Sequence, residues 1–138
     1  KAKEQALLHM AELENFKKRK NQEVDTFKKF AAENVINAFL PVIDNFSIAC
    51  THAEANKEAK SDIVQGFILI QKQIDSTLEK LNITTIDALN QAFDPNLHQA
   101  IGREKQDNTE TDIVIKEVQK GFKLHEKIIR PAMVIVSE

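Results

Sequence analysis

Hydrophobic residues near the start of the chain recur at a spacing of eleven positions. Two series show this spacing, Leu13, Val24 and Val35, and Phe16, Phe27 and Ala38, and a third starts from a lysine: Lys20, Ala31 and Val42. Eleven residues in three turns is about 3.67 residues per turn, close to a relaxed α-helix, so the three series form one seam with slight right-handed supercoiling. The pattern predicts a helix over residues 1–40, about 60 Å long at 1.5 Å per residue.

This apolar stripe is too narrow to wrap around a globular core, and no other segment is long enough to cover it. A second copy of the helix would cover it, so the pattern predicts a homodimer. The predicted interface consists of Leu13, Phe16, Val24, Phe27 and Val35. Aromatic side chains and the stem of Lys20 make it a looser zipper than Leu and Ile at every position would.

A second helical segment is predicted over residues 41–82. Pro41 cannot donate a backbone hydrogen bond, so the first helix should kink or break there. A short apolar-faced helix then leads through the polar link 54–62 to an N-cap at Ser61 or Asp62, followed by a helix of about five turns. Such a hairpin exposes too much apolar area alone, but two hairpins form a four-helix bundle. The bundle interface is predicted to include Phe67, Ile70 and Ile74.

Gly66 lies inside this last helix, where glycine costs about 1 kcal/mol relative to alanine. Close packing at a helix crossing is the preferred interpretation. Direct contact with a partner whose backbone approaches there is the alternative.

The period of the pattern changes after Asn82, and residues 83–138 are predicted to form a small β domain. Three segments predict strands: "ITTID" at 83–87, "DIVIKEV" at 112–118 and "AMVIV" at 132–136, the last buried on both faces. A turn is predicted at 119–121, with Gly121 at a position suited to positive φ. The fold class is therefore α+β, with a β domain too small to be stable without excellent packing or a platform beneath it.

"FDPNLHQAIG" at 93–102 is either a catalytic loop around His98 or a rigid corner. No carboxylate can be placed beside His98 from sequence, which favours a hydrogen-bonded structural histidine over a general base. Cys50 lies on an apolar helix face, which favours a small buried hydrophobe over a reactive thiol. Neither metal-ligand spacing nor a nucleotide-binding glycine motif is present, so we predict no enzyme, no cofactor and no metal.

Charge and composition narrow the class of partner. The net charge is −2, made of +1 over residues 1–60 (ten Lys/Arg, nine Asp/Glu) and −3 over the rest (nine against twelve). This balance argues against nucleic-acid binding, and "KKRK" at 17–20 has the charge spacing of a solvated helix, with an acidic protein partner as the alternative. The single cysteine predicts a reducing compartment, and without an 18-residue apolar run or signal peptide we expect a soluble protein with no membrane contact.

Four segments, in this order, resemble the GrpE family, the nucleotide exchange factors of DnaK-type chaperones. They are "NFKKRK" at 15–20, "LPVIDNF" at 40–46, "FDPNLHQAIG" at 93–102 and "EVQKGFKLHEKIIRPAMVIVSE" at 117–138. The resemblance covers essentially the whole chain. It implies a parallel dimer of long helices, a central four-helix bundle, and a β domain that docks on the chaperone's nucleotide-binding domain, opens its cleft and accelerates ADP release. A bacterial cytoplasmic protein is expected, and a mitochondrial matrix protein is the alternative.

Carried onto matching positions, the resemblance implies partner contacts at Phe93, Pro95, Val118 and Val136 in the β domain, at Lys17 and Arg19 in the first helix, and at Gly66. Asp94-Pro95 is expected to hold Phe93 outward, with His98 and Ile101 anchored inward. Phe16 and Thr26 depart from residues common in the family, and Thr26 leaves a further helix salt bridge there in doubt. A structural dimer that tethers a partner without altering its nucleotide kinetics is the competing function, and an RNA or DNA binder using residues 17–20 is the third.

Overall fold

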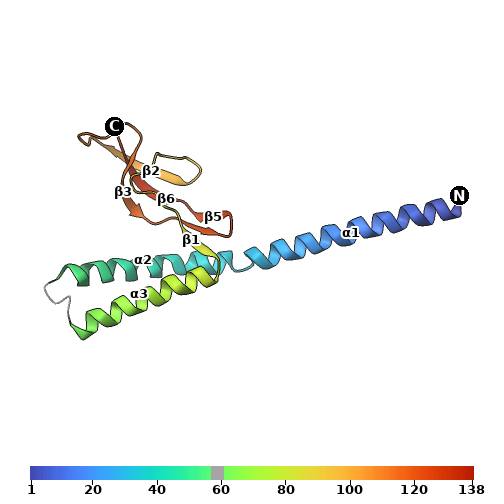
Figure 1. The fold of residues 1–138 in the computed structure, drawn as a ribbon, viewed down its shortest axis with the longest axis horizontal. Coiled ribbons are helices and arrows are strands. Elements are labelled where there is room, and N and C mark those ends of the chain that lie inside the picture. The colour runs from blue at the N-terminus through green and yellow to red at the C-terminus, as the bar shows by residue number, and fades with distance from the viewer. Residues whose placement is uncertain (57–60) are drawn as a thin grey trace. The chain divides into compact units, whose positions relative to one another are not determined.

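The computed structural model describes residues 1–56 and 61–138. The described chain is α+β, with helices first and strands after them (Figure 1). It divides into two compact units, Lys1–Ala32 and Glu33–Glu138, which are described separately below.

The first unit is helix α1, Ala2–Phe30. None of its residues is buried, and the apolar stripe predicted from the sequence is open to solvent, with Leu13 52% and Phe27 73% exposed. Glu4 in the first turn and Lys28 and Lys29 in the last turn complement the helix dipole. The long helix is therefore confirmed up to Phe30, and its pairing with a second copy stays a prediction.

The helix ends differ from the prediction. Two turn residues, Ala31 and Ala32, follow α1, and helix α2, Glu33–Ala55, then runs through Pro41 without a break. The proline removes one backbone hydrogen bond, but Leu40 beside it is only 1% exposed and Cys50 is buried further along the same helix. Burial of one helix face outweighs the local cost of proline, so a break at residue 41 was the wrong expectation.

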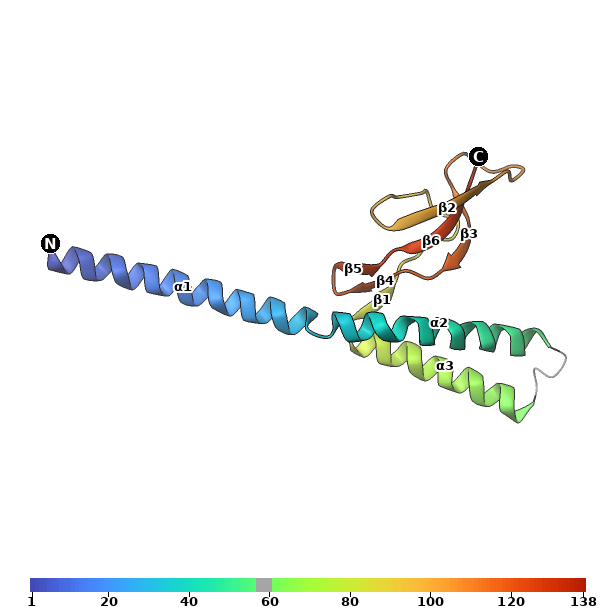
Figure 2. The same cartoon turned by 180° about the vertical axis from the view of Figure 1, so that it is seen from behind.

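Helix α3, Asp62–Lys80, lies beside α2 and completes the predicted hairpin (Figures 1 and 2). Ser61 is the N-cap, because its side-chain oxygen accepts a hydrogen bond from the Val64 backbone N–H at 3.3 Å. The Phe46 and Phe67 rings meet edge to face, 6.0 Å between centroids. Residues 57–60 of the predicted polar link lie outside the described part of the chain.

The β domain contains two three-stranded sheets. The first has the order β1-β4-β5 and is antiparallel, with β1 Ile83–Thr85, β4 Phe122–Leu124 and β5 Lys127–Arg130. The second has the order β2-β6-β3, with β2 His98–Glu104, β6 Ala132–Ser137 and β3 Val114–Gln119. In it β6 is central, parallel to β2 and antiparallel to β3.

Strand β6 supplies most of the domain's core. The core cluster consists of Ala88, Val114, Ala132, Val134 and Val136. Ser137 is the last residue of the strand. Its hydroxyl accepts a hydrogen bond from the Ile113 N–H at 3.0 Å and donates one to the Glu110 carbonyl. The predicted strands at 83–87, 112–118 and 132–136 are confirmed with shifted ends, whereas β2, β4 and β5 were not predicted.

Glycine is needed at position 121 because of a close backbone approach and not because of the predicted positive φ. No glycine among the described residues has positive φ. A Cβ at Gly121 would instead lie 2.5 Å from the Ala132 backbone nitrogen and 2.8 Å from Ile86 Cδ1. Glycine is required there because the chain entering β6 passes too close for any side chain.

Candidate partner-binding surface

An arginine of the β domain forms an ion pair with a carboxylate of the hairpin. Arg130, at the end of β5, donates from Nη1 to Asp44 Oδ2 at 2.6 Å and from Nη2 to Asp44 Oδ1 at 2.9 Å. Both side chains are largely removed from solvent, at 16% and 17% exposure. This is a two-point, charge-assisted pair, the geometry in which a planar guanidinium fixes orientation as well as distance.

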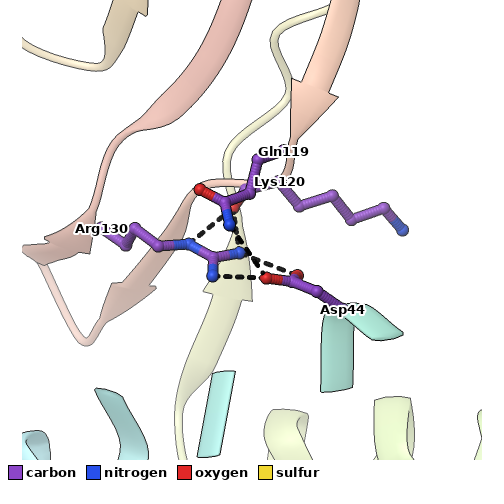
Figure 3. A network of polar contacts seen from close by, with 4 residues as sticks. All are labelled: Asp44, Gln119, Lys120 and Arg130. Carbon is purple, nitrogen blue, oxygen red and sulfur yellow. Dashed lines mark hydrogen bonds and ion pairs between the residues drawn. The ribbon is translucent and has the colours of Figure 1, made fainter. Parts of the chain in front are cut away.

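Four further contacts complete the network. Arg130 donates to the Lys120 carbonyl from Nε at 3.0 Å and from Nη2 at 2.5 Å, and the guanidinium carbon lies 5.2 Å from the centre of the Phe122 ring. Gln119 Nε2 donates to Asp44 Oδ2 at 3.2 Å. We call Asp44, Gln119, Lys120 and Arg130 the polar clamp; Figure 3 shows them converging from α2, from β3 and the residue after it, and from β5.

A second ion pair joins the same two parts. Lys127 Nζ, at the start of β5, lies 2.7 Å from Glu33 Oε2, at the start of α2. The lysine side chain is 54% exposed, so solvent screens this pair more than it screens the clamp.

A groove of about 610 Å³ lies between α2 and β3, bordered by the clamp. Its helix wall includes Ile48, Thr51 and His52, and its sheet wall includes Val118 and Met133. Val118 is 49% exposed, so an apolar side chain is available there to a partner.

Glu117 adds a titratable group to the sheet wall of the groove. Burial raises the pKa of its carboxyl, and the nearby Asp87 raises it further, while Lys120 acts in the opposite direction. The carboxylate is therefore held in an unfavourable environment at neutral pH.

The predicted contact residues of the β domain do not share one environment. Pro95 and Val118 are exposed, as a contact surface requires. Val136 is fully buried in the core, so its side chain cannot touch a partner in this conformation. Phe93 is half-buried and packs on the same core, so the expectation that it points outward was wrong.

The corner at 93–102 has a specific hydrogen-bonded structure. The Asp94 carbonyl accepts from the His98 N–H at 2.8 Å, and Asp94 Oδ1 accepts from the Asn96 N–H at 2.9 Å. His98 Nδ1 accepts from the Asp94 N–H at 3.1 Å, and its Nε2 has no hydrogen-bond partner among the described residues. The hydrogen-bonded corner and the buried His98 are confirmed, but Ile101 is 47% exposed rather than anchored inward.

The helical contact residues lie on exposed faces. Lys17 and Arg19 are exposed on α1, where the Arg19 guanidinium lies 5.6 Å from the Phe16 ring centre. A Cβ built at Gly66 would meet nothing within 4 Å beyond its own helix turn, so the close packing preferred for this glycine is not found among the described residues of this single chain. Contact with a second copy or with a partner stays as the prediction for Gly66.

Sequence reasoning missed the clamp. Asp44 lies in "LPVIDNF" at 40–46 and Arg130 in "IIRPAMV" at 128–134, and in both a charge interrupts an apolar run. A charge in such a place requires a partner, because burying it alone is costly. That signal could have identified both residues, although not their pairing.

The described residues contain no group of three or more His, Cys, Asp or Glu side chains placed to hold a metal ion. No helix in the described ranges combines the length and the apolar character needed to span a bilayer. Cys50 is buried, and burial, followed by the charge of Glu54, raises the pKa of its thiol, which disfavours the reactive thiolate.

The chain is an α+β protein with an exposed apolar helix, a helical hairpin and a small β domain, and a groove lies between α2 of the hairpin and β3 of the β domain. A family model described as GrpE matches residues 1–138. Protein GrpE of Bacillus velezensis is 40% identical over 99% of this chain and 71% of its own length, and Protein GrpE of Bacillus subtilis is 37% identical over 99% and 73%. Protein GrpE of Geobacillus stearothermophilus is 39% identical over 93% of this chain and 58% of its own length.

The chain therefore belongs to the GrpE family, whose known role is that of a co-chaperone of DnaK.

Proposed function

We propose that this protein is a nucleotide exchange factor that binds the nucleotide-binding domain of a DnaK-type chaperone, opens its cleft and accelerates ADP release. Membership of the GrpE family across the whole chain carries this proposal. The protein acts through binding rather than as an enzyme, and it needs no cofactor. The bacterial relatives support a bacterial cytoplasmic location.

The groove between α2 and β3 is the proposed docking site. It combines the exposed Val118 with polar side chains of both walls, and Pro95 offers a second exposed apolar contact elsewhere in the domain. Interfaces of this kind have an apolar centre and a polar rim. Lys17 and Arg19 on α1 are proposed as further contacts for an acidic surface of the chaperone.

The active form is proposed to be a homodimer. Leu13, Phe16, Val24 and Phe27 leave large apolar areas exposed along α1, as Val35 does on α2 and Phe67 and Ile70 do on α3. Ile74 is half-buried in the single chain. A second copy would remove these side chains from water, which is the main driving force of such association.

The mechanism follows from linkage. A factor that binds the open-cleft chaperone more tightly than the closed one shifts it toward the open state, where ADP loses part of its contacts. ATP, which favours closure, must weaken the factor's binding by the same coupling energy. A coupling of ~3 kcal/mol corresponds to about 150-fold in affinity.

The test is stopped-flow release of a fluorescent ADP analogue from a DnaK-type chaperone, with and without this protein. Val118→Glu should reduce the acceleration, because it places a charge in the apolar centre of the contact. Ile101→Glu is the matched control, since Ile101 is a similarly exposed β-branched residue, 47% against 49%, outside the groove lining. Binding without acceleration would instead leave a tethering dimer, and a steep salt dependence of binding to RNA or DNA would favour the third function.

A further inference from the structure

We propose that the polar clamp is a positioning device: Asp44 and Arg130 hold the β domain in one orientation on the hairpin, so that α2 and β3 present one preformed surface to the chaperone. The inference rests on the proposed function. It assigns to both residues a role in binding that acts through the position of the groove walls, and Arg130 is not itself part of the groove lining.

The geometry of Arg130 is that of an orienting contact. All three guanidinium nitrogens donate: Nη1 and Nη2 to the Asp44 carboxylate, and Nε and Nη2 to the Lys120 carbonyl. A single hydrogen bond would let the β domain rotate relative to the hairpin, whereas a guanidinium bonded along two of its edges fixes that rotation. The face of the Phe122 ring, 5.2 Å from the guanidinium carbon, restrains the plane of the fork as well.

The clamp lies where rotation would matter most. Asp44, Gln119 and Lys120 belong both to the clamp and to the lining of the groove. Val118 lines the sheet wall of the groove, and Ile48 and His52 line the helix wall. A change of angle between α2 and β3 would therefore move the two walls relative to each other.

The other attachments of the β domain constrain it less. The chain passes from α3 to β1 through Leu81 and Asn82, and Asn82 has a positive φ of 59°. The Lys127–Glu33 pair is an ion pair with a half-exposed lysine, which solvent screens. Without the clamp, the short covalent link, the screened ion pair and the approaches of α3 to β1 and of α2 to β5 would remain, and the two-point contact that fixes the rotation of the domain would be lost.

The clamp is separate from the core of the domain that it orients. The core cluster is formed by residues of β3, β6 and the segment before β2, and it includes no clamp residue. Loss of the clamp should therefore change the orientation of the β domain while its β2-β6-β3 sheet stays folded.

A positioning role has a distinct kinetic signature. If only a fraction of molecules holds the binding-competent orientation, the apparent dissociation constant rises by the inverse of that fraction, while the bound complex is unchanged. A clamp variant with about one molecule in ten competent should need about tenfold more protein for half-maximal acceleration of ADP release, with the same plateau rate.

The experiment titrates wild type, Asp44→Asn, Arg130→Ala and the reversed pair Asp44→Arg with Arg130→Asp in the stopped-flow assay. Both single variants should raise the half-maximal concentration about tenfold without lowering the plateau, and the reversed pair should recover part of the loss. Arg103→Ala is the matched control: it removes an arginine ion pair, 2.8 Å to Asp112, from the same domain outside the clamp, and should titrate as wild type does. Unchanged titrations of the single variants, or a lower plateau at an unchanged half-maximal concentration, would overturn the proposal.

A second measurement needs no chaperone, so it separates failure of the clamp from failure of the proposed function. In a Cys50→Ala background, spin labels at the exposed positions Ser76 of α3 and Gln99 of β2 report the distance between hairpin and β domain. Labelled chains are mixed with excess unlabelled protein, so that distances within one chain dominate. The distance distribution should be narrow with the clamp and broad in Asp44→Asn, while amide spectra show that the β domain stays folded. Distance distributions of equal width in the two proteins would refute the positioning role, even if the wild-type protein accelerates ADP release. Failure of the wild-type protein to accelerate ADP release would refute only the proposed exchange function.

Discussion

Gly121→Ala is expected to destabilise the β domain. The added Cβ would lie 2.5 Å from the Ala132 backbone nitrogen and 2.9 Å from the Pro131 carbonyl carbon, where ordinary contacts begin at 3.4 Å. The overlap with the nitrogen is therefore 0.9 Å (3.4 minus 2.5). The Ile86 methyl group, at 2.8 Å, can turn away, but the two main-chain atoms lead into the central strand β6.

The magnitude follows from two opposing effects. Overpacking of a tight interior typically costs about 1–3 kcal/mol, and a clash with main chain belongs at the upper end of that range. Replacing glycine also restricts the unfolded chain, which contributes about 0.4–1 kcal/mol in the stabilising direction. The net loss should be about 2 kcal/mol, or roughly 8–16 °C in the melting temperature of a domain of this size.

The assay must resolve the β domain from the helices. The chain contains no Trp and no Tyr, so intrinsic tryptophan fluorescence is not an option, and far-UV circular dichroism reports mainly the helices. Urea titration followed by the amide NMR signals of Val134 and Val136 would report β6 directly. Gly102→Ala is the control, since a Cβ there meets no described atom within 4 Å. Equal midpoints for the two variants would refute the steric argument.

Two further predictions concern single side chains. Gly66→Ala should stabilise α3 by about 1 kcal/mol in thermal melts, because alanine favours the helix interior and its Cβ meets no described atom. The same variant should weaken chaperone binding in a titration. Lower thermal stability would instead place a second copy against this position. Glu117→Gln should raise stability at neutral pH: the native pKa is raised, so the native state binds more protons than the unfolded state and loses stability as pH rises through that pKa. The gain should vanish below the ordinary glutamate pKa, and a gain independent of pH in urea titrations would contradict this cause.

Local patterns predicted much of the helical part. The apolar spacing on α1 and the cap at Ser61 depend on residues near one another in the sequence, and both were found where predicted. Strand β6 was also predictable from its uninterrupted apolar run, because this central strand buries one face and half-buries the other.

The remaining features depend on distant partners. Asp44 and Arg130 are 86 positions apart, so neither charge by itself indicates the other. Pro41 continues a helix because one face of α2 is buried, and Phe93 turns inward because it packs against the nearby core. Tertiary packing decided each of these cases against the local preference.

The central place of β6 also bears on how the protein is made. Synthesis proceeds from the N-terminus, so both edge strands β2 and β3 leave the ribosome before the strand that joins them. Helix α3 ends at Lys80 and β6 at Ser137, a difference of 57 residues (137 minus 80), which takes roughly 3–11 s at about 5–20 residues per second. The nascent helices are thus complete, and free to meet another copy, seconds before the β domain of the same chain can close around its last strand.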